Sequence, residues 1–177
     1  LFACLAGYAP SGARDSNVIS DNFFTNCDAY DPNTPSYGIG VAVLNNYYAK
    51  ITNNRMTAVG KGVQTNNNSL AAPTSGYVPE VSGNAIQATR VGVWHNLFYQ
   101  SAQTWSIANN AITRAASSRT SQWNGVWVES MQDSQTVTIS GNSINGAGLS
   151  GRPVVGYLLN NVVSSAASSS SISGGTV

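Results

Sequence analysis

The chain has 177 residues, of which only 15 are charged (eight Lys and Arg, seven Asp and Glu), so the formal net charge is +1. This balance argues against a basic nucleic-acid-binding surface, and no run of about 20 apolar residues predicts a membrane span. By its length we expect one domain, residues 1–177, with one continuous core; the domain is either a fragment of a longer repeat protein or one unit of a tandem or head-to-tail assembly.

A short phrase recurs along the chain, with an apolar residue at its first and last positions and Asn at its fourth. Good copies occupy residues 19–24, 51–56, 81–86, 107–112 and 139–144, and a weaker copy closes the chain at 172–177. The Asn residues of the good copies are separated by 32, 30, 26 and 32 positions. A period in this range is typical of a stacked solenoid, in which one repeat cannot bury its apolar face without its neighbours.

A glycine followed by an apolar or aromatic residue precedes or separates the copies of the phrase. The segments around it are short and β-branched, and no stretch keeps the period of 3.6 residues that a helix requires. We therefore predict an all-β fold of about six coils of parallel strands. The glycine pairs are Gly7-Tyr8, Gly38-Ile39, Gly62-Val63, Gly92-Val93, Gly125-Val126 and Gly156-Tyr157.

The Asn of each phrase is expected to turn the chain at a corner. The residue before it is Asp, Asn or Gly in every good copy, and these types tolerate positive φ. Stacked coils would place the asparagines above one another, with their amides bonded along the axis. We interpret them as a structural ladder rather than as catalytic groups. Its members are Asn22, Asn54, Asn84, Asn110 and Asn142.

The recurring phrase and the glycine strands resemble the right-handed parallel β-helix repeat, the fold of pectate lyases, polygalacturonases, many phage tailspikes and large bacterial surface proteins. The resemblance covers essentially the whole chain. It implies a right-handed parallel β-helix solenoid. It implies no particular activity, because one fold of this kind carries many functions.

Residues suited to catalysis or to metal binding are scarce. His95 is the only histidine, and no Cys and His residues have metal-binding spacing. The seven carboxylates are scattered, and Asp28 with Asp31 is the pair that leaves acid–base chemistry open. We predict no catalytic residue, no metal and no cofactor.

Cys4 and Cys27 lie 23 residues apart, on neighbouring predicted coils. A disulfide between them would staple the first two coils in an oxidising compartment. Their offsets within the repeat differ, so two buried free thiols remain the alternative.

The aromatic residues suggest one binding surface. Trp94 and Trp127 both stand two positions after the repeat glycine, so we expect them to be neighbours on adjacent coils, about 4.8 Å apart. Exposed stacked indoles suit sugar rings, and Trp123, Trp105 and Tyr99 are expected to extend the patch. The alternative is that a loop or another protomer covers this face.

The two ends of the sequence are complementary half-coils: the first residues supply a glycine strand, and Ile172–Val177 supplies an Asn-type phrase. We therefore expect a non-catalytic structural or adhesive module of an extracellular or cell-surface β-helical fibre, with copies or tandem units stacked head to tail. The alternative is a polysaccharide-binding or polysaccharide-degrading β-helix, such as a tailspike, lyase or hydrolase fragment. Other copies of the chain, and in the alternative a polysaccharide, are the predicted partners.

Overall fold

The structure is a computed structural model that describes residues 2–27, 38–67, 74–97, 103–117, 121–129, 135–146, 153–160 and 169–173. Over these ranges the only regular elements are β-strands, and every strand pair is parallel. The predicted all-β fold with parallel strands is confirmed.

The described part of the chain contains thirteen strands. They are β1 (Phe2–Ser20), β2 (Phe23–Thr25), β3 (Gly38–Thr52), β4 (Arg55–Asn67), β5 (Glu80–Ser82), β6 (Ala85–Leu97), β7 (Gln103–Ala108), β8 (Ala111–Arg114), β9 (Trp123–Glu129), β10 (Gln135–Ser140), β11 (Ser143–Asn145), β12 (Val154–Asn160) and β13 (Ser169–Ser173).

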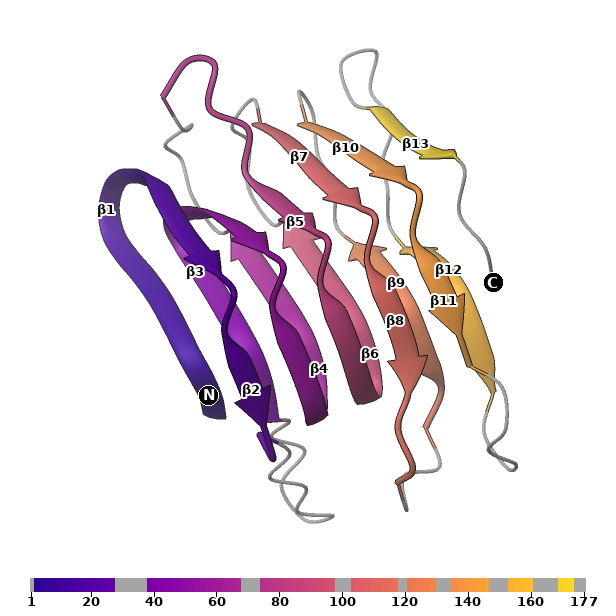
Figure 1. The fold of residues 1–177 in the computed structure, drawn as a ribbon. Helices are drawn as coiled ribbons and strands as arrows, with labels where there is room; N and C mark the ends of the chain where they lie inside the picture. The colour runs from indigo at the N-terminus through magenta and orange to yellow at the C-terminus, as the bar shows by residue number, and fades with distance from the viewer. Residues whose placement is uncertain are drawn as a thin grey trace.

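Each repeat lies beside the next one. The main path of the sheet runs β11-β8-β6-β4-β3-β5-β7-β10-β13, while β1 pairs with β3, β2 with β4, and β9 with both β6 and β12. The colour in Figure 1 therefore passes from indigo on one side of the molecule to yellow on the other. Strands from neighbouring repeats bond to one another, so long-range pairing follows the order of the sequence.

The apolar residues of the recurring phrase form two buried columns. The first position gives Ile19, Ile51, Val81, Ile107 and Ile139, which are partners in register and at most 7% exposed. The last position gives Phe24, Met56, Ile86, Ile112 and Ile144, also in register. Full burial of one such side chain contributes roughly 1.5–3 kcal/mol, so these columns supply much of the core.

The glycine column differs from the expected one at its first two places. Gly40, rather than Gly38, aligns with Gly62, and Gly7 pairs with Val43 outside the column. The reason is space: a Cβ on Gly40 would lie 2.8 Å from the carbonyl oxygen of Gly62 and 3.0 Å from the sulfur of Met56. A side chain at position 40 would collide with Met56, the last residue of the next copy of the phrase. Glycine is therefore needed at position 40, and this is why Gly40 rather than Gly38 stands in the column.

Candidate functional site

The five ladder asparagines form one continuous chain of hydrogen bonds. The Oδ1 of Asn54 accepts from the backbone N–H and the side-chain amide of Asn22, each at 3.0 Å. The same two bonds join Asn54 to Asn84 (2.9 and 3.0 Å), Asn84 to Asn110 (3.1 and 2.9 Å), and Asn110 to Asn142 (3.0 and 2.9 Å). All but Asn22 are 1% exposed. The ladder thus satisfies the buried polar groups at the corner.

The corner before each ladder Asn has the backbone geometry expected from the sequence. The preceding residue has a φ between 56° and 66° in all five copies, which are Asp21, Asn53, Gly83, Asn109 and Gly141. Short polar side chains and glycine are the types that adopt this conformation at low cost.

Trp94 and Trp127 lie on adjacent strands and stack on each other. Their ring centroids are 5.3 Å apart and the planes are inclined by 24°. The Lys61 ammonium lies 3.6 Å from the centroid of Trp94, so Trp94 has a cation at one face and an indole at the other. Both rings are half-buried.

Polar groups tie this cluster together on β4, β6 and β9. Glu129 accepts from the indole N–H of Trp94 at 2.8 Å and from the amide of Asn96 at 2.9 Å. Lys61 donates to the amide oxygen of Gln64 at 2.9 Å. The carboxylate of Glu129 therefore orients the cluster. Glu129 stands four positions after Gly125, as Asn96 stands four positions after Gly92, and this shared spacing is the signal in the sequence that could have identified it.

Three further aromatic residues were expected in the same patch. Trp123 is fully buried, and its indole N–H donates to the backbone oxygen of Ala88 at 3.0 Å. Trp105 is 1% exposed. Both belong to the core, so their expected role in an exposed patch is wrong. Tyr99 lies outside the described residues.

The outermost strands expose apolar side chains at both ends of the stack. We call β1 with β2 the head edge, and β11 with β12 and β13 the tail edge; within the described residues each of these strands pairs with one neighbour. Leu5 of the head edge is 38% exposed although its in-register partner Val41 is 0% exposed. Leu159 of the tail edge is 42% exposed although its partner Val128 is 0% exposed.

Most of the exposed large apolar residues that the structure describes lie on the terminal strands. Six of the seven lie on the terminal strands, and the seventh is Val78. Leu5, Tyr8, Val18 and Phe23 belong to the head edge, and Val154 and Leu159 belong to the tail edge. Leu5, Val154 and Leu159 have buried in-register partners, whereas Val18 and Phe23 continue columns whose next members, Lys50 and Arg55, are also accessible.

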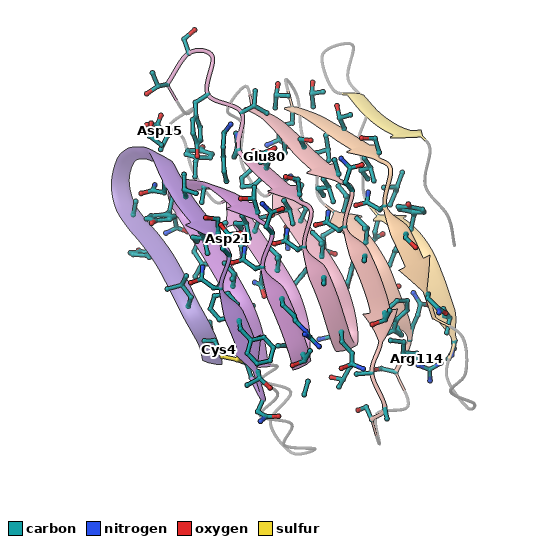
Figure 2. The ribbon with its side chains drawn as sticks, viewed as in Figure 1. Cys4, Asp15, Asp21, Glu80 and Arg114 are labelled. Atoms are coloured by element: carbon teal, nitrogen blue, oxygen red, sulfur yellow. A yellow bond between two sulfur atoms is a disulfide. The ribbon has the colours of Figure 1, made fainter. Side chains whose placement is uncertain are left out.

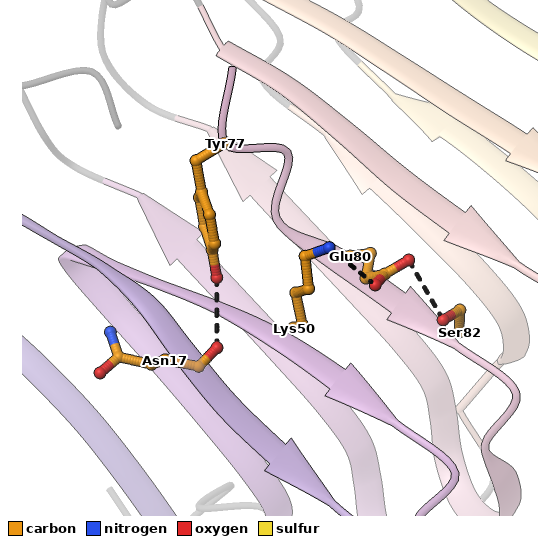
Figure 3. A network of polar contacts seen from close by, with 5 residues as sticks. All are labelled: Asn17, Lys50, Tyr77, Glu80 and Ser82. Carbon is orange, nitrogen blue, oxygen red and sulfur yellow. Dashed lines mark hydrogen bonds and ion pairs between the residues drawn. The ribbon is translucent and has the colours of Figure 1, made fainter. Parts of the chain in front are cut away.

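A short segment before β5 crosses from the third repeat to the first. The hydroxyl of Tyr77 donates to the backbone oxygen of Asn17 at 3.2 Å, and Lys50 and Glu80 form an ion pair at 3.5 Å beside it (Figure 3). The backbone N–H of Thr74 donates to the Asp15 carboxylate, and hydrogen bonds from the side chain and the backbone of Thr74 lower the pKa of Asp15. Burial, with smaller contributions from nearby carboxylates, raises the pKa of Tyr77 to about 12. We call residues 74–79 the clasp.

Cys4 and Cys27 form a disulfide with their Cα atoms 6.0 Å apart, seen in yellow beside Cys4 in Figure 2. This separation lies within the normal range for a disulfide. The bond joins the start of β1 to the residues after β2, so both strands of the head edge are held by it.

The carboxylates do not converge on a reaction centre in the part of the chain that the structure describes. Figure 2 shows Asp15, Asp21 and Glu80 at separate positions, and Glu129 is engaged in the tryptophan cluster. Over the described ranges no group of three His, Cys, Asp or Glu residues could hold a metal ion. Asp28 and Asp31 lie outside the described residues.

His95 is fully buried beside Trp105, with the ring centroids 4.9 Å apart. Its Nδ1 forms a hydrogen bond with the hydroxyl of Thr65, and its Nε2 is buried without a partner. Burial lowers the pKa of His95 to about 3. The ring is therefore neutral in the core at ordinary pH and is enclosed on all sides.

Parallel strands in register, a corner ladder of asparagines and apolar inner columns fit a β-helix-like protein. The chain belongs to the family described as protein of unknown function DUF1565, known as a β-helix-like domain, whose model matches residues 23–149. Comparison with curated proteins and comparison with solved structures each gave no match. The described residues contain no helix of the length and apolar character needed to cross a membrane.

Proposed function

We propose that this protein is a structural module of a β-helical fibre or surface protein, and that it extends by stacking coils along the axis. In this proposal the chain is a right-handed parallel β-helix of about six coils, as in the pectate-lyase-like proteins that its sequence resembles. The head edge of one unit receives the tail edge of another, through the covalent chain or between protomers.

The observation that carries the proposal is the contrast between the ends and the middle of the core columns. Leu5 and Leu159 occupy columns whose next members are 0% exposed, yet they are themselves 38% and 42% exposed. An edge strand with unpaired backbone groups is a template for adding another strand. Another coil at either edge would bury these side chains and pair these backbone groups together.

An extracellular or cell-surface location is part of the proposal. The Cys4–Cys27 disulfide supports it, because such bonds persist in oxidising compartments. A disulfide at the head edge also suits a role in which that edge bears the contact with the next unit.

Sedimentation velocity over a range of concentrations tests the stacking. We expect the 177-residue chain to form a concentration-dependent series of species that continues beyond the dimer, since head-to-tail contacts do not close. Leu5→Pro should shorten the series, because proline cannot donate to a strand ladder. A chain that stays monomeric at every concentration, with its native β-sheet circular dichroism spectrum, would contradict the proposal.

The alternative function is polysaccharide binding, and the stacked Trp94 and Trp127 are the observation in its favour. Because Lys61 and Trp127 lie on the two faces of Trp94, a sugar would contact the indole edges and the polar groups around Glu129. Glycan-array binding that is lost in Trp127→Ala but kept in Trp105→Phe, a buried control, would favour this function. Release of new reducing ends from a polysaccharide would indicate degradation instead.

A further inference from the structure

Phe23 is an apolar side chain on the outer face of the first corner. The next residue, Phe24, belongs to the column that packs against the core, so Phe23 points away from the core. It is 62% exposed. The guanidinium of Arg55, its in-register partner on β4, lies 5.6 Å from the centroid of the Phe23 ring. A ring and a cation therefore share one outward surface.

The surface is lower on both sides of Arg55. Ala85 and Ala111 follow Arg55 in the same column, and these short side chains border a hollow of about 270 Å³. Arg55 also borders a second hollow of about 410 Å³, which Phe23 and Asp21 line with it. Phe23 and Arg55 thus protrude, and a partner that approaches this face meets them first.

The second hollow carries one charge of each sign, and the two charges are not paired. Asp21 and Arg55 are both exposed. Among the described residues Lys50 and Glu80 form an ion pair, whereas neither Asp21 nor Arg55 has one. A carboxylate and a guanidinium form strong charge-assisted hydrogen bonds. Both groups are therefore available to a partner outside the chain.

We propose that this patch, made of Asp21, Phe23 and Arg55, pairs with the same patch of a second copy across a twofold axis. Phe23 lies between the two charges, because Asp21 precedes it by two residues and Arg55 is beside it on the next strand. A twofold axis through the two Phe23 rings brings the Asp21 carboxylate of each copy to the Arg55 guanidinium of the other. A self-complementary contact of this kind is the usual form of a twofold interface.

This contact is lateral, so it goes beyond the stacking function and does not compete with it. A further coil at the head edge would lie beside β2, whereas Phe23 points away from the core on the outer face. The patch is small for a stable interface, so single chains pair weakly through it. In the proposed fibre the patch recurs with every unit, and many weak contacts together would join two fibres side by side.

Charge reversal tests the twofold contact in a parent chain that carries Leu159→Asp, which blocks stacking at the tail edge. Arg55→Glu and Asp21→Lys each place like charges opposite one another, so each variant should be monomeric by sedimentation where the parent dimerises. An equimolar mixture should restore the dimer. In that mixture the introduced lysine faces the introduced glutamate, and the native Arg55 and Asp21 face each other.

A milder pair of variants covers the case in which a reversal disturbs the corner. Asp21 has a φ of 59°, which lysine adopts at a cost, whereas asparagine occupies the same position as Asn53 and Asn109. Asp21→Asn and Arg55→Gln should each weaken dimerisation about tenfold, the loss expected for two surface ion pairs. Val18→Ser is the control, because Val18 is 65% exposed on the same coil but lies outside the patch.

The outcomes separate this contact from stacking. If wild-type protein stops at a dimer that Leu159→Asp leaves unchanged and Arg55→Gln weakens, lateral pairing holds and stacking is wrong. A parent chain that stays monomeric up to about 1 mM, or a mixture of the reversed variants that does not dimerise, overturns the pairing. Without self-association, retention on sulfated dextran that is lost in Arg55→Gln would show that the patch receives an anionic polymer instead.

Discussion

At the scale of single residues, the amide groups of the corner determine how one repeat meets the next. Asn84 is typical: its Oδ1 accepts two N–H groups from Asn54, and its side-chain amide donates to the backbone oxygens of Ile51 and Ser82 and to Asn110. No other side chain of similar size supplies both a two-fold acceptor and these donors. This combination of one acceptor oxygen and several N–H donors explains why Asn recurs at the corner of each repeat.

Replacing Asn84 with Leu should lower the free energy of unfolding by about 1–3 kcal/mol, because the backbone groups that it serves stay buried without partners. Urea denaturation measures the change. Asn160→Leu on β12 is the control, since Asn160 is exposed and its replacement should change stability by less than about 0.5 kcal/mol. Equal midpoints for wild type and Asn84→Leu would show that the ladder adds no stability.

The buried histidine predicts a dependence on pH. Burial lowers the pKa of His95 to about 3, whereas an unfolded histidine titrates near 6.5. Below pH 6.5 the unfolded chain therefore binds a proton that the folded chain excludes, so stability falls as the pH decreases from 6.5 toward 3. The slope approaches about 1.4 kcal/mol per pH unit for one proton.

His95→Gln should remove this slope while keeping a polar partner for Thr65. The comparison is sharpest between pH 6.5 and 5, where most carboxylates remain ionised in both states. Urea denaturation at four pH values in that interval measures it. Parallel curves for the two proteins would show that His95 does not titrate as its buried position requires.

At the scale of elements, the clasp fixes the head edge from two repeats away. Tyr77 reaches Asn17 and Thr74 reaches Asp15, so residues before β5 hold the second half of β1. The disulfide holds the first half of β1 at Cys4. The terminal strand β1 is thus held at both of its halves. Within the described residues it has no strand on its outer side.

Tyr77→Phe removes the hydroxyl that bonds to Asn17 and should lower stability at neutral pH by roughly 1 kcal/mol. Because the pKa of Tyr77 rises to about 12 on folding, the wild-type hydroxyl contributes fully below pH 10 and loses its contribution between pH 10 and 12. The difference between the two proteins should therefore shrink over that interval. Thermal unfolding followed by circular dichroism measures it, with the exposed Tyr8→Phe as control; a difference that stays constant to pH 12 contradicts the role of the hydroxyl.

The sequence predicted the structure correctly where a position in the repeat can be filled by only one or two residue types. The positive φ before each ladder Asn, the position of the ladder and the adjacency of Trp94 and Trp127 all follow from spacing within the repeat. The predicted glycine column contained Gly38, whereas the structure places Gly40 there. Both glycines matched the pattern in the sequence, and only the close contact with Met56 distinguishes them.

Contacts between residues at unlike positions of the repeat could not be predicted. Trp123 stands two positions before the repeat glycine Gly125, and this spacing did not reveal that its indole reaches the Ala88 carbonyl in the core. The clasp joins residues about 60 positions apart, and no pattern in the sequence relates Tyr77 to Asn17. Contacts of this kind are determined by packing in three dimensions.

At the scale of the whole molecule, the described residues form a stack of repeats with a consistent interior, in which each terminal strand pairs with one neighbour. The in-register columns run from β1 toward β12 and β13, and the exposed apolar residues gather where the columns stop. In the proposed stacking function, each added coil would bury the last one, so growth along the axis is expected to be favourable at every step.

Cryo-electron microscopy of the wild-type chain at high concentration tests this account most directly. The account predicts linear particles in which β12 and β13 of one copy lie next to β1 of the following copy, with strands continuing at the spacing of about 4.8 Å across the junction. Single particles whose head and tail edges both face solvent, or pairs joined head to head, would contradict it.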